Sequence, residues 1–357
     1  MKVGLMQRVL AGYRVPFFDM LAERLDGTLS LYAGAPRESE MIDSSKEPQV
    51  ASLWRAKNRN LFSGKAFLCF QTDVRDWLRT EDPDVLIMEA NLRYPMSALA
   101  ARWMRQKNRP VIGWGLGTGN TASGFLNQKH LSRYDALITY SHAGLESYAA
   151  AGFPKDRIFL ARNAAAPKPT RQMPERPMSF TGAPKVLYVG RIQERKRLDL
   201  LMRACSELAP LRPALRIVGD GPIRPQLEEL AASLYPETVF SGALYGGELT
   251  AAFDDADLFV LPGTGGLAIQ QAMASALPVI AAEADGTQTD LVRPENGLIV
   301  KPGDLESLKQ AMAALLNDPR HLREMGAESF RIVRDEINLE AMADAFIGAI
   351  NRVRSRS

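Results

Sequence analysis

The feature that most constrains this chain is a repeated alternation between short apolar runs and segments with helical periodicity. Runs rich in Val, Ile and Leu alternate with helical-period stretches, which is typical of β-α-β units around parallel sheets. In the first half we expect strands at Val3–Leu5, Val85–Met88, Val111–Trp114, Leu137–Tyr140 and Ile158–Ala161, and helices at Phe17–Arg24 and Pro95–Gln106. The pattern predicts an α/β protein.

A proline-rich segment interrupts the alternation, and its composition is typical of a linker. After this segment the alternation restarts. Strands are expected at Val186–Val189, Leu215–Val218, Val239–Phe240, Leu258–Leu261, Val279–Ala281 and Leu298–Val300, and helices at Leu198–Glu207, Ile223–Leu234 and Leu305–Leu316. With 357 residues the chain is long enough for two domains. We therefore predict two Rossmann-like domains, 1–165 and 183–338, joined by a linker, 166–182, and followed by a C-terminal helix in 339–357.

Charge is divided unevenly between the two halves. Residues 1–171 carry 24 Lys and Arg against 16 Asp and Glu, a net charge of +8, whereas residues 172–357 carry 20 against 25, a net charge of −5. This asymmetry suggests a separate partner for each half, and chance scatter over two surfaces is the alternative. The two cysteines lie far apart without a Cys or His at metal-ligand spacing, which predicts no zinc site and a reducing cytosol.

No membrane-spanning helix or signal peptide is expected. Arg8 and Arg14 interrupt what would be the apolar core of a signal peptide, and the longest uncharged run, 258–282, contains prolines and glycines that favour a strand, turn and helix. The basic stretch Arg102–Arg109 suits peripheral attachment to an anionic membrane, with a solvated helix face as the alternative. Nucleic-acid binding is not expected, because the basic residues are not interleaved with exposed aromatics. We expect a cytoplasmic protein.

Cations and glycines follow the expected strands of the second half. Arg191 and Lys196 come just after Gly190, where two cations suit a diphosphate, and a solvated basic loop is the alternative. Another strand runs into Gly263–Gly266, and the N–H groups of Gly266 and Leu267 would begin a helix that can bind phosphate. The Lys-Ser/Thr pair of a P-loop is missing there, which disfavours an ATPase.

The order of the motifs is more specific than any one of them. In sequence they are Gly190-Arg191-x4-Lys196, Val218-Gly-Asp-Gly-Pro, Phe240-Ser-Gly242, Asp257–Pro262, Gly266-Leu267, Gln271-Ala-Met-Ala, Pro278-Val-Ile, Asn296-Gly-Leu-Ile-Val and Pro302-Gly-Asp. This set resembles the donor-binding domain of family 4 glycosyltransferases over about Lys185 to Leu316, and more weakly in the first half. The family implies retaining enzymes of the GT-B fold, in which two Rossmann-like domains face a central cleft and the C-terminal helix crosses back to the first domain.

The resemblance also implies roles for single residues. Arg191 and Lys196 would hold the donor diphosphate and neutralise charge as the sugar–phosphate bond breaks. Gln271 stands where the family has the second Glu of an E-x7-E signature, which binds the ribose. The implied donor-binding residues are Gly12, Gly190, Gly242, Gly263, Thr264, Gly265, Gly266, Leu267 and Gln271.

Two positions depart from the family pattern. The first Glu of the signature, which contacts the donor sugar in the family, falls at Gly263; adjacent Thr264 could replace it in part, or an unusual sugar could fill the space. The His that often follows the strand at Val111–Trp114 is missing from Gly113-Trp-Gly-Leu-Gly-Thr-Gly. On the acceptor side we expect contacts from Tyr13, Arg14, Glu89, Arg93 and Trp114, and a structural role is the alternative for each.

The leading hypothesis is a retaining transferase that moves a sugar from a nucleotide sugar, most simply a UDP-sugar, to a glycan or lipid-linked acceptor in cell-surface polysaccharide synthesis. As the resemblance implies it, transfer on the front face needs no metal and no further cofactor. One alternative is a degenerate transferase that binds nucleotide as a partner subunit; tight nucleotide binding without turnover, unrestored by Gly263→Glu and Gln271→Glu, would favour it. The other is a sugar-nucleotide epimerase of the same fold.

Overall fold

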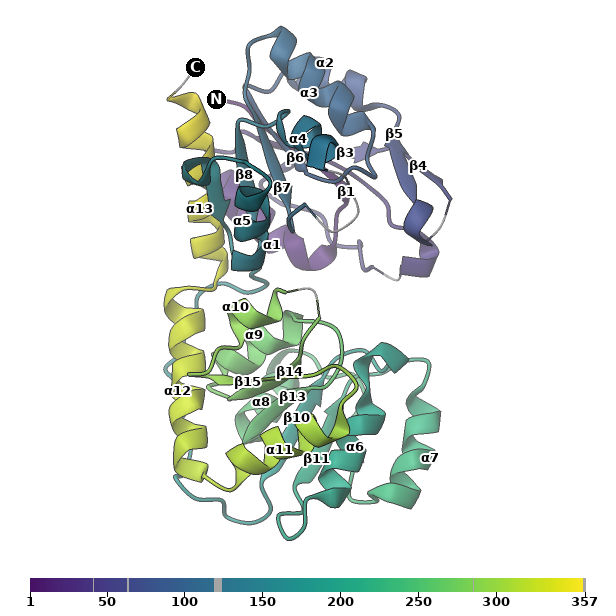
Figure 1. The fold of residues 1–357 in the computed structure, drawn as a ribbon, viewed down its shortest axis with the longest axis vertical. Coiled ribbons are helices and arrows are strands. Elements are labelled where there is room, and N and C mark those ends of the chain that lie inside the picture. The colour runs from purple at the N-terminus through teal and green to yellow at the C-terminus, as the bar shows by residue number, and fades with distance from the viewer. Residues whose placement is uncertain (41, 63, 119–123, 285, 356–357) are drawn as a thin grey trace. The chain divides into compact units, whose positions relative to one another are not determined.

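The computed structural model describes residues 1–357 except 41, 63, 119–123, 285 and 356–357 (Figure 1). The chain forms two compact units. The first contains Met1–Ala165 together with Leu339–Ser357, and the second contains Ala166–Asn338. Each unit has a parallel sheet of the doubly wound kind, so the predicted α/β class with two Rossmann-like halves is confirmed. The C-terminal helix belongs to the first unit, as the GT-B resemblance implied.

The first unit is built on a seven-stranded parallel sheet of order β3-β2-β1-β6-β7-β8-β9. Its strands are β1 (Val3–Val9), β2 (Leu29–Gly34), β3 (Ser52–Ala56), β6 (Val85–Glu89), β7 (Val111–Gly115), β8 (Ala136–Thr139) and β9 (Ile158–Leu160). The strand order reverses between β1 and β6. In open α/β sheets, ligands bind outside the carboxyl ends of the strands at such a reversal.

Helices cover both faces of this sheet. They are α1 (Val15–Glu23), α2 (Val74–Glu81), α3 (Met96–Gln106), α4 (Gly124–Leu131), α5 (His142–Ala150) and α13 (Leu339–Arg354). Val3 and Leu5 of β1 pack with residues of α1 and α13, whereas Met6 packs with residues of α2, α3 and α5. Successive side chains of a strand point to opposite faces, so the apolar run of β1 supplies both cores.

Four strands of the first unit were not expected from the sequence. They are β2, β3 and an antiparallel hairpin of β4 (Asn58–Leu61) and β5 (Leu68–Gln71). Every residue of β2 is buried, but Ser30 and Gly34 break its apolar run, and β3 and β4 alternate with polar residues. Pairing between strands stabilises them more than a strong local pattern does: β2 and β3 join the parallel sheet, and β4 and β5 pair only with each other among the described residues.

The second unit has a six-stranded parallel sheet of order β12-β11-β10-β13-β14-β15. Its strands are β10 (Lys185–Val189), β11 (Ala214–Val218), β12 (Val239–Phe240), β13 (Leu258–Leu261), β14 (Val279–Ala282) and β15 (Gly297–Val300). All six lie where the sequence predicts strands. The order reverses between β10 and β13, the two strands that precede the predicted phosphate-binding loops.

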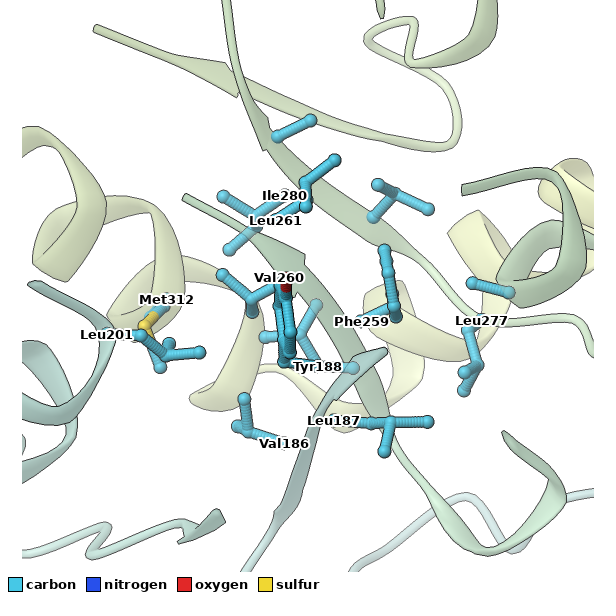
Figure 2. Packing of buried hydrophobic residues seen from close by; sticks show 14 of the residues in the cluster. Val186, Leu187, Tyr188, Leu201, Phe259, Val260, Leu261, Leu277, Ile280 and Met312 are labelled. Atoms are coloured by element: carbon cyan, nitrogen blue, oxygen red, sulfur yellow. The ribbon is translucent and has the colours of Figure 1, made fainter. Parts of the chain in front are cut away.

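Helices pack around this second sheet and complete its core. They are α6 (Leu198–Glu207), α7 (Arg224–Leu234), α8 (Gly246–Asp255), α9 (Leu267–Ala274), α10 (Gln288–Leu291), α11 (Leu305–Leu316) and α12 (Pro319–Asp335). Figure 2 shows Tyr188 of β10 within this core, close to Val260 of β13. Because the strands are buried on both faces, they are nearly continuous apolar runs.

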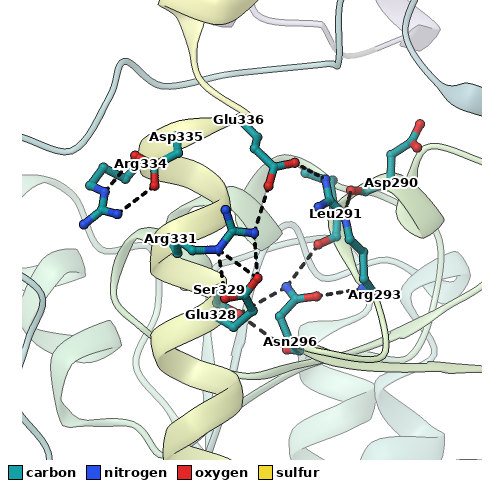
Figure 3. Close-up of polar contacts among 10 residues, drawn as sticks. All are labelled: Asp290, Leu291, Arg293, Asn296, Glu328, Ser329, Arg331, Arg334, Asp335 and Glu336. Atoms are coloured by element: carbon teal, nitrogen blue, oxygen red, sulfur yellow. Dashed lines mark hydrogen bonds and ion pairs between the residues drawn. The ribbon is translucent and has the colours of Figure 1, made fainter.

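A polar network joins α10, β15 and α12 in the second unit (Figure 3). Glu336 bonds to Arg293 at 2.8 Å and to Arg331 at 2.9 Å. Asn296 is fully buried; its amide oxygen accepts the N–H of Arg293 at 2.7 Å and its amide nitrogen donates to Ser329. The Asn-Gly motif singled out in the sequence therefore fixes the turn before β15.

The proline-rich segment is attached to the second unit by two arginines. Arg171 forms a bidentate ion pair with Asp254, in which Nη1 donates to Oδ2 at 2.7 Å and Nη2 donates to Oδ1 at 2.8 Å. Arg176 donates to the carbonyl oxygens of Phe253, Ala256 and Ser275 at 3.0, 3.0 and 2.6 Å. These carbonyls lie at the carboxyl ends of α8 and α9, where helices leave acceptors unpaired. Burial lowers the pKa of Arg176 to about 10, so it remains charged at neutral pH.

We predict that Arg176→Ala lowers the free energy of unfolding by about 1–3 kcal/mol, because it leaves partly buried carbonyls without a donor. Arg320→Ala is the matched control. The side chain of Arg320 is 79% exposed and pairs only with Glu324 among the described residues, so its loss should change stability by less than about 0.5 kcal/mol. Urea unfolding of the two variants measures both effects, and equal midpoints would contradict this function of Arg176.

Candidate functional site

Three loops meet at the carboxyl end of the second sheet, where the strand order reverses. They follow β10, β11 and β13 and hold one another by backbone hydrogen bonds. The N–H of Gly190 donates to Val218 at 3.0 Å, that of Ile192 to Asp220 at 2.8 Å, and that of Thr264 to Arg195 at 3.0 Å. The predicted donor residues after β10 and β13 are thus brought together.

Glycines permit this close approach of backbones. A Cβ on Gly219 would lie 2.0 Å from the carbonyl oxygen of Gly190, and one on Gly221 would lie 2.0 Å from that of Ile192. Gly219 also donates its N–H to Gly242 at 2.7 Å, which brings the end of β12 to the same place. The Gly-Asp-Gly motif is therefore required by packing between loops.

Gly263 has the same kind of role, which bears on the Gly263→Glu variant named above. A Cβ at this position would lie 2.2 Å from the carbonyl oxygen of Arg195 and 2.6 Å from the Cα of Lys196. No side chain fits there without moving the loop after β10. A glutamate therefore cannot be restored by Gly263→Glu, and Gly263 is a packing requirement of this loop rather than a simple loss of the family acid.

Lys196 belongs to the loop after β10 and reaches the loop after β13. Its ammonium donates to the carbonyl oxygen of Thr264, and a Cβ on Gly265 would lie only 2.4 Å from Nζ. Gly265 has φ +136°, which side-chain-bearing residues rarely adopt. Burial, and then the charge of Arg195, lower the pKa of Lys196 to about 8. The ammonium is thus mostly charged at pH 7 and poorly solvated, which favours an anionic ligand.

Arg191 and Arg195 provide further positive charge. The Arg191 side chain is exposed, and its carbonyl oxygen accepts the hydroxyl of buried Tyr188 at 3.1 Å, which ties this loop to the core. Arg195 donates from Nη1 to the hydroxyl of Thr264 at 3.2 Å. Sequence reasoning missed Arg195, although it stands next to Lys196, because nothing local indicates that it reaches the loop after β13.

Helix α9 begins at this junction, with Gly266 as its N-cap. It has no side-chain cap and no acidic residue in its first turn, so the first N–H groups and the helix dipole are available to an anion. Leu267 is 43% exposed. Gln288 of α10, which the sequence did not indicate, donates to the carbonyl of Gly265 at 2.9 Å and so supports the loop.

The two glutamines of α9 have different surroundings. Gln271, predicted to bind the ribose, is exposed on the helix. Gln270 is 2% exposed and donates to the carbonyl oxygen of Ile337 at 2.8 Å, a structural contact within the second unit. Of this pair, only Gln271 is placed to meet a ligand.

Asp255 and Asp257 are used in ion pairs. Asp255 pairs with Lys185, and Asp257 accepts the N–H of Lys185 at 2.8 Å and pairs with Arg323. In the part of the chain that the structure describes, no three His, Cys, Asp or Glu side chains are grouped so that they could hold a metal ion.

The first unit has a cavity of about 480 Å³ at the carboxyl ends of β6 and β7. Glu89, Arg93 and Trp114, three of the predicted acceptor residues, line it together with Asn91 and His130. Glu89 accepts the N–H of Arg8 at 2.6 Å, and burial raises the pKa of its carboxyl group. The cavity offers hydrogen-bonding groups of the kind that bind hydroxyls.

His130 was not identified from the sequence. It lies on α4, and burial followed by the charge of Arg133 lowers its pKa to about 4, so the imidazole is neutral at pH 7. The sequence lacked a His just after β7, but the fold brings this one to the same cavity as Gly115 and Thr118. The only signal in the sequence that could have pointed to His130 is that it is one of just three histidines and lies in a segment with helical periodicity.

Three of the other predicted residues are committed to the fold. Arg14 is 6% exposed, donates to Asn163 at 2.6 Å and stacks on the Trp114 ring. Trp114 is 1% exposed and packs on Phe346 of α13, and it also lines the Glu89 cavity. Gly12 donates its N–H to Asp43 at 2.7 Å. Arg14 and Trp114 both have structural contacts, and the predicted contact of each with an acceptor stays a prediction.

Tyr13 remains accessible. It is 40% exposed, and the guanidinium of Arg14 lies 5.1 Å from its ring centre. The backbone of Gly12 has no free N–H for a ligand, because Asp43 accepts it. Of the loop after β1, only Tyr13 presents a side chain that could contact an acceptor.

Comparison with known proteins decides the family. The sequence pattern of the family "Glycosyl transferases group 1" matches residues 183–318, the part that forms most of the second unit. A GDP-mannose-dependent alpha-mannosyltransferase of Mycolicibacterium smegmatis is 31% identical over 285 residues, which are 73% of this chain and 73% of that protein. The chain belongs to the group 1 glycosyltransferases. The family 4 resemblance expected from the motif order is thereby confirmed.

Two further similar proteins support the assignment and the fold. Sulfoquinovosyl transferase SQD2 of Arabidopsis thaliana is 38% identical over 156 residues, 42% of this chain, and the chain spans 29% of that protein's length. HepE of Anabaena, solved in complex with UDP, matches with a TM-score of 0.70 over 99% of this chain and 100% of that one, at 16% identity. The latter likeness supports the GT-B fold of this group 1 glycosyltransferase.

We predict that Gly263→Ala lowers the free energy of unfolding by about 1–3 kcal/mol and impairs nucleotide binding, because the added methyl overlaps the Arg195 carbonyl. Gly266→Ala is the control in the same loop. Its Cβ would first meet Leu291 at 3.9 Å, an ordinary contact, so stability should change little. Denaturant unfolding of both variants tests this, and a stable Gly263→Ala protein would show that the loops can separate without cost.

Proposed function

We propose that this group 1 glycosyltransferase transfers a sugar from a nucleoside-diphosphate sugar to a hydroxyl of a glycan or lipid-linked acceptor, with retention at the anomeric carbon. The observation that carries the proposal is the convergence of Lys196, the loop containing Arg191 and the uncapped start of α9 at one end of the second sheet. Cations and N–H groups held together in this way suit a diphosphate.

The chemistry follows from where charge develops. As the bond between the anomeric carbon and the phosphate oxygen breaks, negative charge grows on the diphosphate, and Arg191, Lys196 and the N–H groups of α9 stabilise it. The acceptor oxygen bonds to the same face of that carbon and gives its proton to a phosphate oxygen of the leaving group. These residues supply the positive charge, so the step as proposed uses no metal ion.

The polar cavity of the first unit is the proposed place of the acceptor. Glu89, Asn91 and His130 can exchange hydrogen bonds with sugar hydroxyls. The neutral state of His130 lets one ring nitrogen accept while the other donates. The acceptor we propose is a growing cell-surface polysaccharide or its lipid-linked precursor, which the cationic first unit would attract.

The donor base is proposed to be uracil, although relatives differ. The structural neighbour HepE was solved with UDP, whereas the mycobacterial relative uses GDP-mannose. A thermal-shift panel of UDP-, GDP- and ADP-sugars distinguishes these donors, because a bound ligand raises the melting temperature by mass action. Binding of one nucleotide without turnover would instead favour a nucleotide-binding partner subunit.

We predict that Arg191→Ala and Lys196→Ala each reduce kcat/KM roughly 10- to 150-fold, the effect of losing a charged hydrogen bond of about 1.5–3 kcal/mol. Arg203→Ala is the control, since Arg203 is exposed on α6 and removes the same charge elsewhere in the unit. Release of nucleoside diphosphate in a coupled assay measures the rates. Full activity in both test variants would show that the diphosphate is bound elsewhere.

We also predict that nucleoside-diphosphate affinity falls as pH rises through about 8, because Lys196 then loses its proton. The bound diphosphate stabilises the ammonium, so binding above pH 8 should take up a proton. Titration calorimetry in buffers of different ionisation enthalpy measures this uptake. In Lys196→Arg the charge persists, and the alkaline loss of affinity should disappear; an unchanged pH profile in that variant would assign the titration to another group.

A further inference from the structure

Arg195 is a third cation at the candidate donor site, next to the two that the proposed function assigns to the diphosphate. It lies in the loop after β10, and its Nη1 donates to the hydroxyl of Thr264, in the loop after β13, at 3.2 Å. Its Nε donates to the side-chain oxygen of Gln193 at 3.0 Å. These two hydrogen bonds hold an exposed arginine at the junction of the two loops.

No acidic side chain neutralises this arginine. Arg195 forms no ion pair with a described residue, and neither does the neighbouring Glu194, which is exposed. By contrast, Arg197 pairs with Asp199 at 3.0 Å. The segment 262–266 contains no Asp or Glu, and the first turn of α9 contains none either. The charge of Arg195 is therefore available to a ligand.

The diphosphate alone does not need this charge. A nucleoside-diphosphate sugar with a neutral sugar carries its negative charge only on the diphosphate. Arg191, Lys196 and the uncapped start of α9 already supply two positive charges and a helix dipole for it. Arg195 adds a further positive charge, and electrostatic complementarity then favours a ligand with a further negative one.

The position of Arg195 places that further charge near the sugar. Lys196 donates to the carbonyl oxygen of Thr264, whereas Arg195 donates to the hydroxyl of the same residue. Gly263 has no side chain that could lie between the two loops. Because the sugar is bonded directly to the diphosphate, a group on the sugar ring is within reach of a guanidinium that lies one residue from the diphosphate site.

The guanidinium of Arg195 has donors left for such a group. Nη2 forms no hydrogen bond with a described residue, and Nη1 has a second hydrogen besides the one that Thr264 accepts. Two donors side by side at the end of a planar fork match the two oxygens of a carboxylate. The excess of Lys and Arg in residues 1–171 also suits the acidic glycan that a sugar with a carboxylate would build.

From these observations we infer that the donor sugar is a hexuronic acid, whose carboxylate accepts hydrogen bonds from Nη1 and Nη2 of Arg195. The inference rests on the proposed function, since it names the class of sugar that the same site transfers. The transfer step is unchanged: the bond from the anomeric carbon to the diphosphate oxygen breaks, the bond to the acceptor oxygen forms, and the carboxylate stays ionised throughout. Arg195 is thus a specificity-determining residue.

The test compares sugar nucleotides that differ only at C6 of the sugar. The pairs are UDP-glucuronic acid with UDP-glucose, UDP-galacturonic acid with UDP-galactose, and GDP-mannuronic acid with GDP-mannose. Titration calorimetry on the full chain should show that the acidic member of one pair binds roughly 10- to 150-fold more tightly than its neutral partner, the effect of a charged hydrogen bond. Equal binding within every pair, tighter binding of the neutral members, or no binding of any acidic member would overturn the inference.

Variants of Arg195 assign the preference to this residue. Arg195→Gln should abolish the preference for the acidic sugar and leave the affinity for the free nucleoside diphosphate nearly unchanged, which also shows that the variant is folded. Arg195→Lys keeps the charge but loses the fork, so it should retain only part of the preference. The matched control is Arg203→Gln, which removes the same charge from an exposed position on α6 and should retain all of it.

Two results with these variants would contradict the role of Arg195. An undiminished preference in Arg195→Gln would place the carboxylate elsewhere. An equal loss of affinity for the free nucleoside diphosphate and for the acidic sugar nucleotide would show that Arg195 binds the diphosphate instead.

The inference and the proposed function fail in different ways. Transfer of a neutral sugar, without any gain for the acidic one, would leave the glycosyltransferase proposal intact and remove the hexuronic acid. Binding of an acidic sugar nucleotide that depends on Arg195, but without release of nucleoside diphosphate to any acceptor, would keep the recognition of the sugar and remove the transfer reaction.

Discussion

The contact on which the candidate site depends is the one between the loops after β10 and β13. The Arg195–Lys196 backbone lies so close to Gly263 that no Cβ fits between them. Through this contact Lys196 reaches the carbonyl of Thr264, and α9 begins with free N–H groups beside it. Since backbone atoms cannot adjust as a flexible side chain can, the geometry of the cationic site follows from glycine at this one position.

The same contact explains why Gly263 stands at the first position of the E-x7-E signature. In the amino-acid sequence alone, a glycine at position 263 in place of the family glutamate suggests a damaged active site. In the structure the glycine is required by the loop opposite, which has Arg195 directed at Thr264. The chemistry at this position therefore differs from the pattern that the family resemblance implies, with the guanidinium of Arg195 and the hydroxyl of Thr264 beside Gly263.

Much of the fold could be predicted from the sequence, because the signals involved are local. The strands of the second unit are mostly apolar runs, and the proline-rich stretch from Pro167 to Pro177 separates the halves. Strands β2 to β5 escaped prediction because polar residues interrupt their pattern and pairing with neighbours stabilises them. The linker was recognised by composition, but its attachment through Arg171 and Arg176 depends on helix ends far away in the sequence.

The sequence by itself determined the α/β class, the two halves and the family, and it indicated Arg191 and Lys196 in the loop after β10. Hydrophobic periodicity and the order of the motifs predict those features, and both can be read without knowing how the chain packs. Only the tertiary structure decided that Arg14 is buried, that Trp114 is buried beside the Glu89 cavity, and that His130 joins the same cavity. The physical reason is that burial, pKa values and charge pairing depend on which distant segments of the chain come into contact. A local sequence pattern does not predict those contacts.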